Sequence, residues 1–192
     1  MTSLKVLVVE EFDSDKLLEH SLLKQGYQVV SIKLSQSNIL ETVHTSQPDV
    51  MVLSVYIPSE KLLSMIIDIN QKRSIPVIMF AEDHQTTTIN KVIKAGVSAY
   101  VVDGLEAKRI KTIIDIAIVR FKEHQALKDE LQKTKNQLED RKTIDRAKAI
   151  LIKSQGYTEE EAYHTLRKLA MDRHVVIGEM AKNVIAMAGL FK

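Results

Sequence analysis

The sequence has no cysteine and no tryptophan, and only 3 prolines and 6 glycines in 192 residues. Without cysteine the chain has no disulfide, no thiolate metal ligand and no cysteine nucleophile. It also lacks an apolar run of the roughly 18 residues that a membrane-spanning helix needs, and its N-terminus lacks the shorter run of a signal peptide. These absences predict a cytoplasmic protein that does not contact a membrane.

The motifs of common enzyme classes are also missing. The sequence contains no glycine-rich dinucleotide motif, no Walker phosphate-binding loop, no serine-hydrolase elbow and no H-E-x-x-H zinc motif. Its 6 histidines are scattered without the spacing of metal ligands. We therefore expect no enzymatic activity, no cofactor and no dedicated metal site.

Neither sign of charge dominates the whole chain, because 27 basic side chains nearly balance 25 acidic ones and leave a net charge of +2. This average hides two unlike halves. Residues 1–105 carry 9 basic and 12 acidic side chains, whereas residues 106–192 carry 18 and 13. The asymmetry, net −3 against net +5, predicts two functional parts.

The first half alternates short β-branched runs with amphipathic stretches of helical length. Apolar residues recur at three- and four-residue spacing in 14–24, 37–45, 60–71 and 86–94, between the runs Val6–Val9, Val29–Ile32, Val50–Leu53, Val77–Phe80 and Tyr100–Val102. Continuously apolar runs are typical of parallel strands that are covered on both faces. The pattern predicts an α/β fold, a flavodoxin-like doubly wound five-stranded parallel sheet.

A single helix is predicted from Ala107 onward, because no stop signal occurs before Gly156. Such a helix is too long for the sheet to cover its far part. A seam with four-three-four spacing runs along its middle: Leu127, Leu131, Thr134 and Leu138. With charged and amide residues around it, this seam resembles a short coiled coil and predicts a homodimer. A solvated connector helix is the alternative.

The chain after Gly156 predicts two further helices. Thr158 and Glu161 form a capping-box pattern at the start of the first. Three apolar stripes predict a three-helix unit: Ile144, Ala147, Ile150 and Leu151; Ala162, Leu166, Leu169 and Ala170; Met180, Val184, Ile185 and Met187. We predict three parts, a domain over 1–120, a coiled-coil linker helix over 121–140 and a small helical domain over 141–192.

In a doubly wound sheet, ligands bind at the carboxyl ends of the strands. The strand ends VLVVEE, PDVMVLSVYIP, IPVIMFAE and GVSAYVVDG resemble the receiver domain of two-component response regulators. A receiver has an acidic pair that binds Mg²⁺, an aspartate that accepts a phosphoryl group, a hydroxyl residue that contacts it, and a lysine. The matching positions here are Glu10 and Glu11, Ser54, Ala81 and Asp103.

The resemblance implies a degenerate phosphorylation site. Ser54 cannot form an acyl phosphate, Ala81 cannot hydrogen-bond a phosphoryl oxygen, and Asp103 places negative charge where an ammonium would balance the phosphate. We interpret the first half as a pseudo-receiver that binds proteins rather than a phosphate switch. Residual Mg²⁺ binding by Glu10, Glu11 and Asp103 stays open.

The stretches DRAKAIL, EEAYHTLRKLAM and AKNVI in 141–192 resemble the ANTAR domain, a three-helix RNA-binding unit of transcription antiterminators. This region carries 10 basic and 6 acidic side chains, and three of the acids cluster at a helix N-terminus. Its cations are predicted to contact RNA phosphates: Arg141, Lys142, Arg146, Lys148, Arg167 and Lys168. Tyr163 either stacks on an unpaired base or packs against the long helix.

The whole arrangement resembles the nitrate- and nitrite-responsive antiterminators of the NasT type, to which amide-responsive antiterminators are related. The resemblance implies binding to leader-mRNA hairpins, which blocks the terminator, and sequestration by a separate periplasmic-binding-protein-like nitrate sensor. The alternative is a protein-interaction adaptor that does not bind RNA. A phosphorylated DNA-binding regulator is disfavoured by Ser54 and by the absence of a helix-turn-helix pattern.

Overall fold

The structure is a computed structural model that describes residues 3–11, 17–35, 38–102 and 106–190. The chain divides into two compact units, Met1–Gln125 and Ala126–Lys192. One helix, α5 (Ala107–Gln155), begins in the first unit and ends in the second. This helix confirms the prediction of a single long helix that stops before Gly156.

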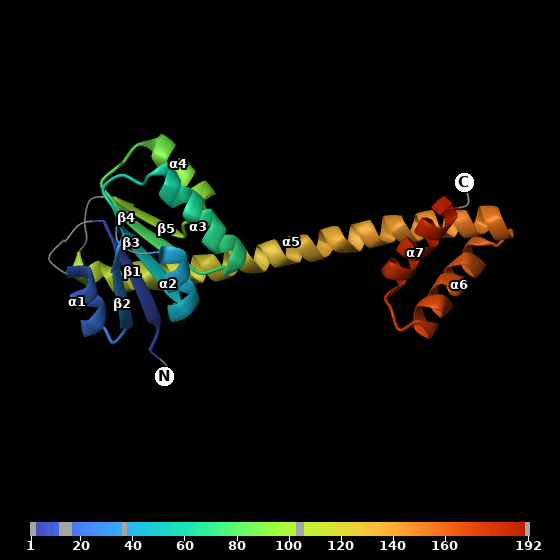
Figure 1. Cartoon of the computed structure of the whole chain (residues 1–192), viewed down its shortest axis with the longest axis horizontal. Helices are drawn as coiled ribbons and strands as arrows, with labels where there is room; N and C mark the ends of the chain where they lie inside the picture. The colour runs from blue at the N-terminus through green and yellow to red at the C-terminus, as the bar shows by residue number, and fades with distance from the viewer. Residues whose placement is uncertain (1–2, 12–16, 36–37, 103–105, 191–192) are drawn as a thin grey trace. The chain divides into compact units, whose positions relative to one another are not determined.

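The first unit is a βα repeat built from short elements (Figure 1). Before α5 these are β1 (Lys5–Glu10), α1 (Leu17–Lys24), β2 (Gln28–Lys33), α2 (Ile39–Ser46), β3 (Val50–Ser54), α3 (Glu60–Lys72), β4 (Val77–Ala81), α4 (Thr86–Lys94) and β5 (Ala99–Val102). The sheet has the order β2-β1-β3-β4-β5, and every neighbouring pair is parallel. The predicted flavodoxin-like doubly wound sheet is confirmed.

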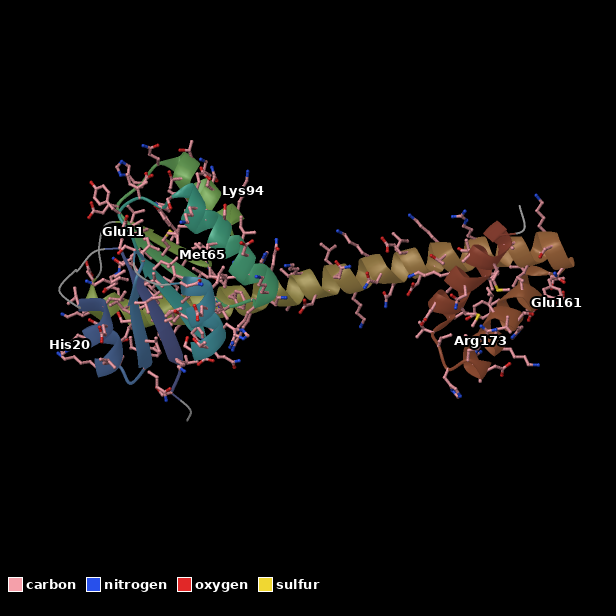
Figure 2. All side chains as sticks on the ribbon, viewed as in Figure 1. Glu11, His20, Met65, Lys94, Glu161 and Arg173 are labelled. Carbon is pink, nitrogen blue, oxygen red and sulfur yellow. The ribbon has the colours of Figure 1, made fainter. Side chains whose placement is uncertain are left out.

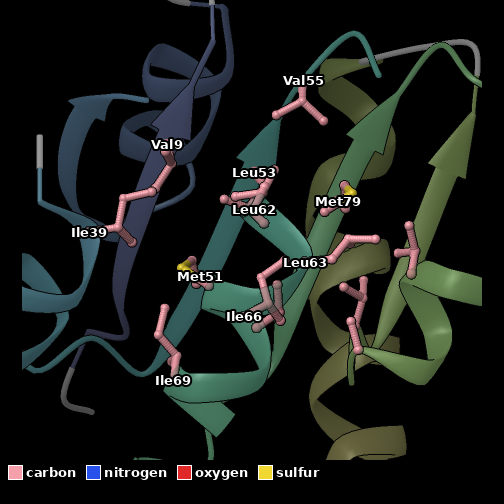
Figure 3. Close-up of a cluster of buried hydrophobic side chains, with 14 of the residues drawn as sticks. Val9, Ile39, Met51, Leu53, Val55, Leu62, Leu63, Ile66, Ile69 and Met79 are labelled. Carbon is pink, nitrogen blue, oxygen red and sulfur yellow. The ribbon is translucent and has the colours of Figure 1, made fainter. Parts of the chain in front are cut away.

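The central strands are buried on both faces, whereas charged side chains such as that of Lys94 on α4 stand at the surface (Figure 2). Alternate strand residues, among them Met51 and Met79, pack against α2, α3 and α4 on one face (Figure 3). The intervening residues, among them Val8 and Ile78, pack against α1 and α5 on the other. The period-two alternation of a strand therefore fills both layers from one apolar run.

The second unit packs the end of α5 against α6 (Glu159–Asp172) and α7 (Ile177–Leu190). Its buried core consists of Ala147, Leu166, Ala170, Met180 and Ala181. The three-helix unit predicted for this region is therefore present. No helix within the described ranges is long and apolar enough to cross a membrane.

The structure tests two predictions for this unit, the capping box at the start of α6 and the apolar stripe of α7. The capping box at the start of α6 is confirmed, because the Thr158 hydroxyl accepts from the Glu161 N–H and the Glu161 carboxylate accepts from the Thr158 N–H at 2.8 Å. The prediction for Met187 is wrong, since this side chain is 57% exposed. The buried stripe of α7 is centred on Ala181, which places Met187 at its margin in the last turn.

Candidate functional site

The predicted acidic edge lies where β1, β3 and β4 end. Glu10 is the last residue of β1, Ser54 the last of β3 and Ala81 the last of β4. The register places Glu10 beside Ser54, and both Glu10 and Ala81 are buried. Asp103 lies outside the described residues. The structure therefore brings together the described strand-end residues of the predicted degenerate site.

Glu11 is bonded to the loop that follows β3 (Figure 2). Its Oε2 atom accepts the N–H of Tyr56 at 2.8 Å, and its own N–H donates to the Ser54 carbonyl at 2.9 Å. The N–H of Glu82 donates to the Tyr56 carbonyl at 3.1 Å. The chain itself thus provides a partner for one carboxylate of the acidic pair. Across the described residues, no group of three or more His, Asp or Glu side chains is placed to hold a metal ion.

Asp83 organises the loop that follows β4, at the same edge of the sheet. Its carboxylate accepts the N–H of Gln85 at 2.8 Å and the hydroxyl of Thr88 at 2.7 Å, and these bonds hold the pKa of Asp83 below its usual value. The hydroxyl of Tyr100 donates to the Asp83 carbonyl at 2.6 Å. Sequence reasoning missed the roles of Asp83 and Tyr100, although an aspartate three residues before a helix start is a recognisable turn signal.

The second unit presents cations on two helices. Arg141, Lys142 and Arg146 on α5, and Arg167 and Lys168 on α6, are all exposed. Within the part of the chain that the structure describes, neither Arg167 nor Lys168 has a hydrogen-bond or ion-pair partner. Their charges are therefore available to an external anion.

Lys148 differs from these cations because its charge is already paired. Its Nζ atom lies 2.8 Å from Asp145 Oδ1 and 2.8 Å from Glu159 Oε1, and its side chain is only 15% exposed. The hydrogen bonds to Asp145 and then Glu159 raise the pKa of Lys148, and the bond from Lys148 lowers the pKa of Asp145. The pair with Glu159 joins α5 to the first turn of α6, whereas the pair with Asp145 lies within α5. Two of the three N–H donors of this ammonium are therefore taken, and a phosphate has to compete with two carboxylates for its charge.

A groove of about 390 Å³ runs between α5 and α6. Tyr163 forms part of its lining, is 42% exposed, and makes an edge contact with His164 at a ring-centroid distance of 6.3 Å. The other lining residues all come from one face of α5: Gln137, Asp140, Arg141, Ile144, Asp145 and Lys148. Sequence reasoning missed Gln137 and Asp140, although they lie four residues before Arg141 and Ile144 respectively, which places them on that face.

The leucines of the predicted dimer seam are exposed on α5 within the second unit. Leu127 is 67% exposed, and Leu131 and Leu138 are each 55% exposed. Exposed leucines at this spacing are typical of a helix that pairs with another helix. The dimer stays a prediction.

Two family models match the chain. The "Response regulator receiver domain" model matches residues 6–115, and the "ANTAR domain" model matches residues 132–185. Together they cover both compact units, and both describe regulatory domains rather than an enzyme family.

The curated relatives and solved structures agree with these models. The chain is 27% identical over 186 residues to the transcriptional regulatory protein PdtaR of Mycobacterium tuberculosis, covering 96% of this chain and 91% of that one. It is 32% identical over 90 residues to the nitrate regulatory protein of Klebsiella oxytoca, covering 47% of this chain and 23% of that one. The chemotaxis response regulator CheY4 of Vibrio cholerae has the same fold in the first unit, with a TM-score of 0.53 at 18% identity over 60% of this chain and 99% of that one. The chain therefore belongs to the response regulator receiver family, and its second unit is an ANTAR domain.

Proposed function

We propose that this protein is an RNA-binding transcription antiterminator, which binds hairpins in leader mRNA and prevents formation of the terminator. The observation that carries the proposal is the folded ANTAR unit with exposed cations that have no partner among the described residues, Arg167 and Lys168 foremost. Arg141, Lys142 and Arg146 extend this basic surface along α5. Unpaired cations at the surface are what RNA phosphates require.

Lys148 is expected to contribute less to phosphate binding than the unpaired cations. A phosphate that contacts it competes with Asp145 and Glu159, its present partners. Arg167 is therefore the better test of RNA binding, because its removal breaks no hydrogen bond or ion pair among the described residues.

The experiment is a gel-shift titration of the full chain with the leader RNA of its own operon, over a series of salt concentrations. Arg167→Gln should weaken binding and reduce the slope of log affinity against log salt by about 0.7 to 0.9, the contribution of one phosphate. Arg173→Gln, which removes an exposed cation just past the end of α6, is the matched control. Equal effects of the two changes would show that the basic surface is placed wrongly, and no binding by the unmodified chain would refute the proposal.

We further propose that a partner protein, rather than phosphorylation, controls the antiterminator in the cytoplasm. Ser54 and Ala81 stand where a receiver needs an aspartate and a hydroxyl residue. The match to a nitrate regulatory protein supports a role in nitrate regulation. The resemblance to the nitrate- and nitrite-responsive antiterminators supports an assimilation operon as the target and a periplasmic-binding-protein-like nitrate sensor as the partner. Purification of the chain from cells grown with and without nitrate tests this, because the sensor should accompany it only without nitrate.

The active form is proposed to be a homodimer joined through Leu127, Leu131 and Leu138. Two ANTAR units held on paired helices would bind two hairpins of one leader. The second hairpin would then bind at a raised effective concentration.

A further inference from the structure

The groove between α5 and α6 differs chemically from the basic surface around it. Its apolar lining is the side chain of Ile144 and the ring of Tyr163. Tyr163 keeps 42% of its surface open to solvent, so part of this residue is accessible from the groove. An aromatic ring beside an aliphatic side chain is a surface on which a planar ring can stack.

The charges that line the groove cancel. Asp140 and Asp145 contribute two negative charges, and Arg141 and Lys148 contribute two positive ones. The pairing of Lys148 with Asp145 and with Glu159 neutralises its ammonium further. A phosphate therefore gains little electrostatic energy in this groove, unlike on the surface that carries Arg167 and Lys168.

The polar lining instead suits a neutral ring with both donors and acceptors. The Gln137 amide offers both kinds of group, the Asp140 carboxylate accepts, and the Arg141 guanidinium donates. A nucleobase edge carries such a mixture, and a carboxylate accepts most directly from an exocyclic amino group.

We propose that the groove binds one unpaired base of the RNA loop, stacked against Tyr163 and read by Gln137, Asp140 and Arg141. This subsite rests on the proposed function, since it presumes that the ANTAR unit binds RNA. The unpartnered cations outside the groove, Arg167 and Lys168, hold the backbone. Affinity from phosphates and selectivity from a base are thereby assigned to separate residues.

The test separates base stacking from phosphate contacts by their salt dependence. The full chain selects binders from a pool of RNA hairpins with a constant ten-base-pair stem and a randomised eight-nucleotide loop. The affinity of the selected hairpin is then measured over a salt series for the unmodified chain, Tyr163→Leu and Tyr163→Phe. Tyr56→Ala is the control, because Tyr56 is an exposed tyrosine of the first unit.

The expected result is a loss of about tenfold for Tyr163→Leu with an unchanged salt slope, because stacking releases no counterions. Tyr163→Phe keeps the ring and should bind within about twofold of the unmodified chain, as should Tyr56→Ala. Asp140→Asn should change which base is enriched at one loop position. Retention of full affinity by Tyr163→Leu, or a lowered salt slope, overturns the base subsite while RNA binding stands. If the unmodified chain selects no hairpin, the proposed function itself has failed.

Discussion

At the scale of single residues, Lys148 shows how one charge can be structural within a basic surface. Its ion pair with Glu159 joins α5 to α6 and its ion pair with Asp145 lies within α5, with Asp145 57% and Glu159 77% exposed. Ion pairs with exposed partners contribute at most about 1 kcal/mol each. Lys148→Gln should therefore lower the free energy of unfolding by about that amount, as measured by urea denaturation. Its RNA salt slope should change less than that of Arg167→Gln, and an equal change would place Lys148 among the phosphate contacts.

Gly178 is a second residue with a close side-chain neighbour. A Cβ atom at this position in α7 would lie 2.7 Å from Asp140 Oδ1 and 2.9 Å from Asp140 Cγ. Gly178→Ala should destabilise the ANTAR unit by about 1 to 3 kcal/mol, the usual cost of overpacking, in thermal melts followed by circular dichroism.

Gly189 provides the matched control on the same helix. A Cβ atom there meets nothing within 4 Å, so Gly189→Ala should leave stability unchanged or raise it by up to about 1 kcal/mol through helix propensity. The cost of Gly178→Ala should shrink in an Asp140→Ala background, because the clashing atoms are gone. A cost that persists there would show that Asp140 is not the cause.

The sequence predicts where a residue lies in its own strand or helix better than it predicts which residues of other helices it contacts. The strand ends that carry Glu10, Ser54 and Ala81 follow from local apolar runs, and the structure places them as predicted. The pairing of Lys148 with Glu159 depends on how α6 folds back on α5, which no local pattern encodes. The groove was missed for the same reason, since Tyr163 comes from one helix and Asp140 from another.

At the scale of elements, the capping box makes the stability of α6 dependent on pH. The N–H of Thr158, and then its hydroxyl, bond the charged carboxylate and lower the pKa of Glu161 from its ordinary value of 4.5. A group with a lowered pKa in the folded state stabilises the fold fully above its unfolded pKa, and this contribution is lost as the pH falls through the folded value. The melting temperature should therefore fall as the medium is acidified below about pH 4.5.

Glu161→Gln should melt at a lower temperature near neutral pH and lose less on acidification. Glu160→Gln, which removes the same charge one residue earlier and leaves the box intact, should keep the acid dependence of the unmodified chain. Identical pH profiles for the two variants would assign the effect to general charge rather than to the cap.

The seam of α5 is the element for which we propose a partner in a second copy of the chain. Leu131→Glu places a charge in the middle of the seam and should convert the proposed dimer to a monomer in sedimentation equilibrium. Leu131 is 55% exposed in the single chain, so the change should leave the fold intact. Lys133→Glu, an exposed position beside the seam, is the control and should remain dimeric. A monomeric unmodified chain at micromolar concentration would contradict the proposed dimer.

At the scale of the whole molecule, the net charge of +2 describes neither half of the chain. Residues 1–105 are net −3 and residues 106–192 are net +5. The basic excess belongs with the ANTAR unit and α5, where an RNA phosphate is the proposed partner. The acidic excess belongs with the receiver domain, where Ser54 at the end of β3 is the predicted acceptor position, and we propose that its signal arrives in a form other than phosphorylation.

This division predicts that phosphoryl donors leave the protein unchanged. Incubation with acetyl phosphate and Mg²⁺ should give no phosphoryl adduct in the intact mass, because the Ser54 hydroxyl cannot form an acyl phosphate and Glu11 already accepts the N–H of Tyr56. A receiver that keeps its aspartate, treated in parallel, shows that the donor is active. RNA affinity should be the same before and after treatment. An adduct that maps to the first unit and alters RNA binding would mean that the receiver still works as a phosphate switch, and control by a partner protein would then lose its main physical argument.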